Sequence, residues 1–119
     1  MSNPVIVRIF DIVGGSLCVS TEDGQRVHYK IAELLRENQK VVLSFEQVET
    51  MISAFLNVAV GQLYGEFPEE LIRGLLSVRS INPDDLDVLK RVVENAKRYF
   101  ANRDVADKAW NDEVGNDEE

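Results

Sequence analysis

Cysteine and histidine are almost absent from this chain of 119 residues, which contains one of each, Cys18 and His28. A single cysteine cannot form a disulfide within the chain. One cysteine and one histidine are also too few ligands for a zinc site built from Cys and His side chains. Catalysis by paired histidines is excluded by the same count. Cys18 has apolar neighbours on both sides and no basic residue beside it, which predicts an inert core cysteine rather than a nucleophile. His28 is expected at the surface or edge of its element.

Long apolar runs and a secretory leader are also missing. No segment approaches the roughly 20 apolar residues that a membrane-spanning helix requires. The first residues show no basic region followed by an apolar stretch and a cleavage site. We therefore expect a cytoplasmic protein with no membrane contact. Hydrophobic residues make up 45% of the chain, which is enough for the core of one domain at this length.

Positive charge is scarce, since 13 Lys and Arg residues face 21 Asp and Glu residues and the net charge is −8. Phosphate backbones and anionic membranes attract basic surfaces, so the balance disfavours general nucleic-acid binding. Seven of the acids fall in the last 16 residues, and the rest of the chain is nearly balanced. We predict a folded domain over residues 4–101 and an acidic, flexible tail over 102–119 that is dispensable for folding.

Phosphate-binding motifs do not occur. The Gly14-Gly15 pair lacks the spacing of a dinucleotide-binding loop, and no Gly-Lys-Ser/Thr sequence is present. The acids Asp84, Asp85 and Asp87 fall in the first turn of a predicted helix, where the helix dipole already explains them. We therefore expect no cofactor, no metal site and no tight nucleotide binding.

The remaining pattern alternates strands with helices. Short apolar and β-branched runs predict strands over residues 5–10, 17–19, 41–45 and 77–81. Apolar residues at helical spacing predict main helices over about 20–38, 53–64 and 82–101, with a short helix over 68–74. This alternation predicts an α/β single-domain layer fold, with about four mostly parallel strands packed against three main helices.

Two helix starts have good capping residues. Ser20 stands three residues before Asp23, which resembles a capping box, and Asn82 precedes Pro83 at the start of the last helix. A hairpin turning at Asp23-Gly24 is the alternative for the first of these segments. The helical recurrence of apolar residues from Val27 onwards favours the helix.

The stretches 41–48 (VVLSFEQV), 52–57 (ISAFLN) and 61–64 (GQLY) resemble the STAS-like domains of unknown function. These domains are relatives of sulfate-transporter and anti-sigma-factor-antagonist domains. The resemblance extends from about Gly24 to Ala96. It departs from the family pattern at Ser44, which replaces an acid at the end of the strand, and at Ala54, which replaces a second serine.

The resemblance implies a function for Ser53. In anti-sigma-factor antagonists the corresponding loop contains an Asp-Ser pair whose serine is phosphorylated by a partner kinase of the GHKL ATPase type. This chain has Ile52-Ser53 there, so the serine is retained and the aspartate is not. The residues alone leave two roles open for Ser53. Its hydroxyl can cap the following helix, which is the favoured role, or it can accept a phosphate that the helix N-terminus would stabilise.

Together these features predict a small regulatory protein-interaction module rather than an enzyme. The resemblance implies a phospho-switchable, antagonist-like module whose partner is a GHKL-type ATPase or kinase or another effector. The predicted partner-binding residues surround the loop and helix at Ser53: Thr50, Met51, Ser53, Phe55 and Asn57. The alternatives are a structural or DNA-linked regulatory subunit of an operon-encoded complex and, less favoured, a small hydrolase, for which the chain offers no clear nucleophile and base.

Overall fold

A three-stranded parallel sheet forms the centre of the molecule. The computed structural model describes the backbone of residues 3–114 and the side chains of residues 3–101. The strand order is β1 (Val5–Arg8), β3 (Val41–Ser44) and β5 (Leu76–Arg79), and both neighbouring pairs are parallel. This confirms the α/β class with parallel strands. The sequence separations between these strands leave room for helical crossovers, which parallel pairing requires.

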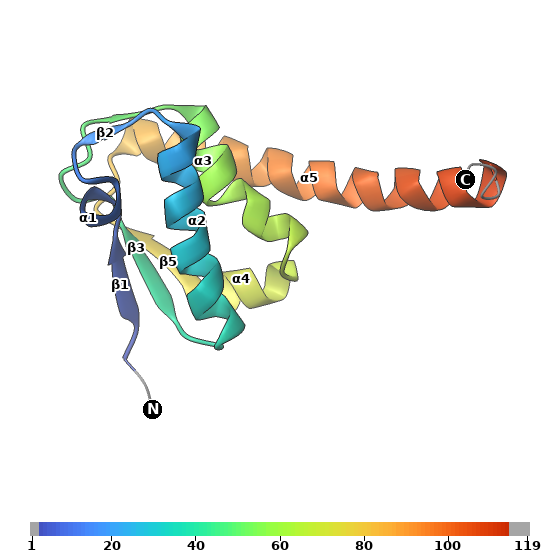
Figure 1. Ribbon diagram of the computed structural model, residues 1–119, viewed down its shortest axis with the longest axis horizontal. Helices are drawn as coiled ribbons and strands as arrows, with labels where there is room; N and C mark the ends of the chain where they lie inside the picture. Colours follow the sequence, from blue (N-terminus) through green and yellow to red (C-terminus); the bar gives the residue numbers. More distant parts are fainter. Residues whose placement is uncertain (1–2, 115–119) are drawn as a thin grey trace.

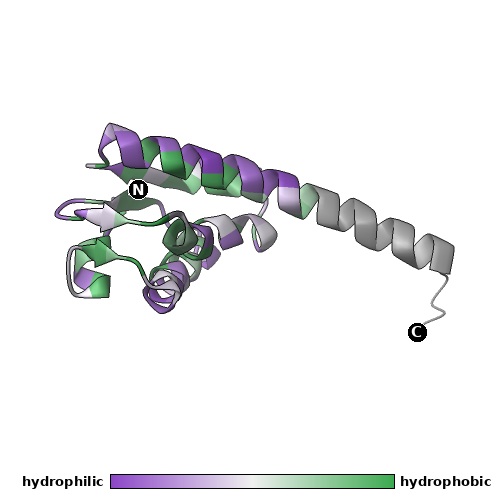
Figure 2. Ribbon diagram, turned by 90° about the horizontal axis from the view of Figure 1, so that it is seen from above, coloured by the Kyte–Doolittle hydropathy of each residue, from purple (hydrophilic) through white to green (hydrophobic). Residues whose placement is uncertain are grey.

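The helices pack on both sides of this sheet. They are α1 (Ile9–Val13), α2 (Thr21–Arg36), α3 (Ser53–Ala59), the 3₁₀ helix η1 (Gly61–Gly65), α4 (Glu69–Leu75) and α5 (Pro83–Val114). Figures 1 and 2 place α2 on one side of the sheet and α5 on the other. Helix α2 also packs against α3, while α5 packs against α3 and η1. The apolar side of α5 faces the body of the molecule (Figure 2).

A second, two-stranded parallel ribbon lies outside the main sheet. It pairs β2 (Leu17–Cys18) with β4 (Thr50–Met51), and the Ile52 amide donates a hydrogen bond of 3.1 Å to the Cys18 carbonyl. Strand β4 is not predicted from the sequence, because a two-residue strand has too few residues to show alternation. The ribbon brings residues 17–19 beside the segment that leads into α3.

Both predicted helix caps are confirmed. The Ser20 hydroxyl accepts a hydrogen bond of 3.2 Å from the Asp23 amide at the start of α2. The Asn82 side-chain oxygen accepts one of 2.8 Å from the Asp85 amide at the start of α5. These bonds satisfy backbone donors that have no partner within the helix.

Two predicted element boundaries are wrong. The strand expected over residues 5–10 ends at Arg8, and α1 follows at once, so that Ile9 turns fully into the core and Gly14 ends the helix at a φ of 86°. The helix expected over 53–64 is interrupted at Val60, whose φ is −117°. Gly61 follows this break, and glycine has a low helix preference, so the chain continues as the tighter turns of η1.

His28 is buried, which corrects the expectation of a surface or edge position. Its exposed fraction is 2%, because α2 is covered by α1 on one side and by α3 and η1 on others. The Nε2 atom lies 3.0 Å from Oε2 of Glu66. The Nδ1 atom has no hydrogen-bond partner among the described residues.

The last helix continues further than the domain boundary expected at residue 101, since α5 reaches Val114. The side chains of the predicted tail, 102–119, lie outside the described residues, so its dispensability stays a prediction. Within the described part of the chain, no helix has the length and apolar character to cross a membrane.

Candidate functional site

Ser53 lies where the β2–β4 ribbon leads into α3, and it is exposed. Ile52 occupies the N-cap position with an extended backbone, at φ −104° and ψ 157°, and no side chain caps this helix. Ser53 is therefore already the first helical residue, one position too late for its hydroxyl to act as the N-cap. The favoured capping role is wrong. The hydroxyl makes no hydrogen bond with any described residue.

An apolar patch adjoins Ser53 on the outer face of the ribbon. Leu17 is 56% exposed, Val19 48% and Ile52 39%. Leu17 is paired with Thr50 in the ribbon, and side chains alternate between the two faces, so Thr50 lies on this outer face as well. We call these four residues the ribbon patch. Adjoining apolar side chains at this exposure are typical of an interaction surface.

A groove of about 330 Å³ runs between α3 and α5 on the other side of Ser53. Ser53 and Asn57 line it from α3, and Arg91 and Asn95 line it from α5. Arg91 is exposed and forms no ion pair with any described residue. The groove therefore places an available guanidinium on the same surface as the Ser53 hydroxyl.

The five residues predicted from the sequence differ in their exposure to solvent. Thr50, Ser53 and Asn57 are exposed, and Ser53 and Asn57 line the same groove. Phe55 is fully buried, so its predicted contact with a partner is wrong; the side chain instead joins the core beneath α3. Met51 is partly buried and packs against the same core. The helical spacing over 53–59 did not show which face is buried, because the segment is apolar almost all the way round.

Several residues of this surface were missed, among them Leu17, Val19, Ile52, Arg91 and Asn95. Leu17 and Val19 lie near Ile52 only because the two strands of the ribbon pair, and paired residues are 33 positions apart in the sequence. Arg91 joins the groove only through the packing of α5 on α3. No local signal in the sequence reports either contact.

The single cysteine and the single histidine of the chain are both buried. Cys18 is fully buried, as predicted, and its burial, with the nearby carboxylates Asp23 and Asp85, raises the pKa of the thiol to about 11. His28 is buried beside Glu66. Among the described residues, no group of three His, Cys, Asp or Glu side chains could hold a metal ion.

Comparison with known protein families gives one match. The model of the STAS-like domain of unknown function matches residues 23–86, which is more than half of the chain. The chain belongs to this family. No curated protein and no solved structure matches the chain. The matched part of this STAS-like domain includes Thr50, Ser53 and Asn57, whereas β2 and Arg91 lie outside it.

Proposed function

We propose that this STAS-like domain is a small regulatory protein-interaction module, and not an enzyme. The proposed binding surface consists of the ribbon patch, Ser53 and the groove between α3 and α5. The observation that supports it is the position of Ser53, whose exposed hydroxyl has no hydrogen bond within the described residues. An apolar patch lies on one side of this hydroxyl, and a groove lined by Arg91 lies on the other.

This arrangement suits control by phosphorylation at Ser53. A phosphate would add negative charge and three strong acceptors at the junction of patch and groove. Arg91 lines the same groove and offers the kind of partner that phosphate prefers. A partner that binds across the junction would then meet a changed charge, and its affinity would change. The resemblance noted above favours a GHKL-type ATPase or kinase as this partner.

The test begins with identification of a partner. The tagged chain is incubated with cell extract, bound proteins are identified by mass spectrometry, and the most abundant one is purified. Its dissociation constant is then measured with the wild type, Ser53→Ala and Ser53→Asp. We expect Ser53→Asp to change the affinity by about tenfold or more, because charge-assisted hydrogen bonds are gained or lost. If the partner is a kinase, incubation with ATP should place phosphate on Ser53.

The matched control is Ser80, which is also exposed and has a φ of 62°, a conformation that aspartate tolerates. Ser80→Asp adds the same charge to another loop and should leave the affinity unchanged. The proposal for Ser53 is wrong if both of its variants fold normally and bind the partner as tightly as the wild type.

A second pair of variants tests the ribbon patch. Val19→Asp places a charge in the patch, whereas Tyr29→Asp places one on another exposed apolar residue, which lies on α2 and is 63% exposed. We expect Val19→Asp to weaken partner binding at least about tenfold, since a buried unpaired charge is costly. Tyr29→Asp should bind like the wild type. If the two variants bound the partner with equal affinity, the ribbon patch would not be part of the binding surface.

A further inference from the structure

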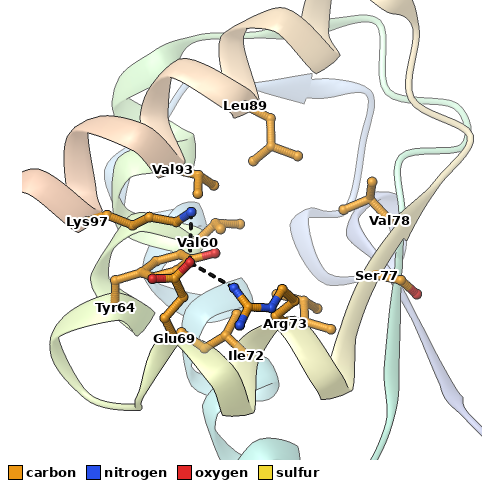
Figure 3. A pocket seen from close by; sticks show the side chains of 11 residues that line it. Val60, Tyr64, Glu69, Ile72, Arg73, Ser77, Val78, Leu89, Val93 and Lys97 are labelled. Atoms are coloured by element: carbon orange, nitrogen blue, oxygen red, sulfur yellow. Dashed lines mark hydrogen bonds and ion pairs between the residues drawn. The ribbon is translucent and has the colours of Figure 1, made fainter.

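A cavity of about 290 Å³ lies between α4, β5 and α5, on a different face of α5 from the groove near Ser53. Figure 3 shows its walls, which come from elements far apart in the sequence. Most of the wall is aliphatic, and three of these side chains, those of Val60, Ile72 and Leu89, belong to the buried core. The aliphatic lining residues are Val60, Ile72, Leu76, Val78, Leu89 and Val93.

The charged groups of the cavity gather at one end, while Ser77 lies beside Val78 on the other side (Figure 3). Oε2 of Glu69 lies 2.9 Å from Nζ of Lys97 and 3.0 Å from Nη1 of Arg73. Tyr64 lines the cavity beside them (Figure 3). Among the residues that line the cavity, one carboxylate thus faces two cations, which leaves one positive charge in excess at this end. Glu94, which does not line the cavity, is a second carboxylate that acts on Lys97. The cavity is amphipathic, with a cationic opening and an aliphatic interior.

We infer that this cavity binds a small monocarboxylic acid with an apolar tail. The carboxylate would lie between Lys97 and Arg73, where a guanidinium and an ammonium can both donate to it. Burial raises the pKa of the Tyr64 phenol, which therefore stays protonated and able to donate a hydrogen bond. The volume suits a molecule of about ten non-hydrogen atoms. The inference is independent of the function proposed for the Ser53 surface.

Glu69 occupies the place of the ligand's carboxylate in this structure. The hydrogen bond from Lys97 lowers the pKa of Glu69, so this side chain is ionised at neutral pH and already pairs with both cations. A ligand must share these cations with Glu69 or displace it. Removing the charge of Glu69 should therefore strengthen binding, whereas removing the charge of Lys97 should weaken it. This opposite response separates a carboxylate site from a general apolar cavity.

The first experiment compares ligands of equal length on the intact chain. Octanoate, n-octylamine and 1-octanol are titrated into isotopically labelled protein, and amide chemical shifts are followed by NMR. We expect octanoate to bind saturably, at least about tenfold more tightly than octylamine, with the largest shifts at residues lining the cavity. Octylamine or octanol binding as tightly as octanoate would overturn the inference, as would the absence of saturable octanoate binding.

The second experiment uses variants whose fold is checked by circular dichroism. Lys97→Met keeps the aliphatic stem and should weaken octanoate binding about tenfold or more, while Glu69→Gln should strengthen it. Lys90→Met is the matched control, because Lys90 is exposed on the same helix and does not line the cavity. Its affinity should equal that of the wild type. Octanoate binding that is unchanged in Lys97→Met, or no tighter in Glu69→Gln, would show that these charges do not recognise the carboxylate.

Discussion

At the scale of single residues, Gly24 shows how tertiary packing can require a locally unfavourable residue. It lies in the first turns of α2, where glycine costs the helix about 1 kcal/mol relative to alanine. A Cβ atom at this position would lie 2.8 Å from the carbonyl oxygen of Phe55 and 3.2 Å from Cβ of Val58. The glycine therefore permits the close approach of α2 and α3, and this approach covers Phe55.

We predict that Gly24→Ala destabilises the protein by about 1–3 kcal/mol, because the contact is with backbone and one of the two helices must move. Gly74→Ala is the control. Gly74 is also in a helix, but a Cβ there would meet no atom within 4 Å, so alanine should stabilise by about 0.4–1 kcal/mol. Urea unfolding of both variants measures the difference. Equal stability of the wild type and Gly24→Ala would show that the helices are not in close contact here.

A second prediction concerns the Cys18 thiol. Since its pKa is raised to about 11, almost no thiolate is present at pH 8, and the sulfur is also buried. A disulfide reagent such as DTNB should therefore leave the native protein unmodified over minutes and react with one thiol after addition of denaturant. The pKa is raised and not lowered because burial disfavours the charged thiolate. Rapid reaction of the native protein at pH 8 would contradict the buried position.

At the scale of elements, the helix starts differ in how they are capped. The side chains of Ser20 and Asn82 accept hydrogen bonds from amides in the first turns of α2 and α5. In α3, which begins at Ser53, the N-cap residue is Ile52, and no side chain caps the helix. Helix α3 is covered by α2 and α5 and gains its stability from this packing. Ser53 is consequently available for another role.

This difference predicts the effects of three alanine variants on stability. Ser20→Ala and Asn82→Ala should each lower the free energy of unfolding by about 0.5–2 kcal/mol, because each leaves a helix amide without its partner. Ser53→Ala should change it by less than about 0.5 kcal/mol, as expected of an exposed position without a cap bond. Thermal and urea unfolding give these values. A loss at Ser53 equal to that at Ser20 would restore the capping role.

At the scale of the whole molecule, α5 connects two separate surfaces. One of its faces lines the groove next to Ser53, and another lines the cavity that contains Lys97. The buried core of the described residues extends along the chain from Val7 to Val92. The domain therefore has its described core before the acid-rich end of the sequence.

We predict from this distribution that a chain ending at Arg103 keeps its melting temperature within a few degrees of the full length. The residues removed include seven acids and few apolar side chains, so they offer little surface to bury. The measurement is a thermal unfolding curve at equal concentration and salt. A fall of about ten degrees or more, which corresponds to more than 1 kcal/mol for a domain of this size, would show that Trp110 packs on the core.

The sequence by itself determined the class of fold, the family and the start of two helices. Alternating apolar patterns and good capping residues are local signals, and Ser20 and Asn82 are in the roles that these signals predicted. The buried state of Cys18 followed from its neighbours in the same way.

Only the tertiary structure decided which residues of the Ser53 region are accessible. Phe55 and His28 are both buried because α2 packs against α3 and η1, a contact that involves side chains from separate parts of the chain. Leu17 and Arg91 reach the surface beside Ser53 for the same reason, through strand pairing and helix packing across long sequence separations. A local pattern specifies an element and its apolar residues, but the side of an almost uniformly apolar helix that is covered depends on its neighbours in space.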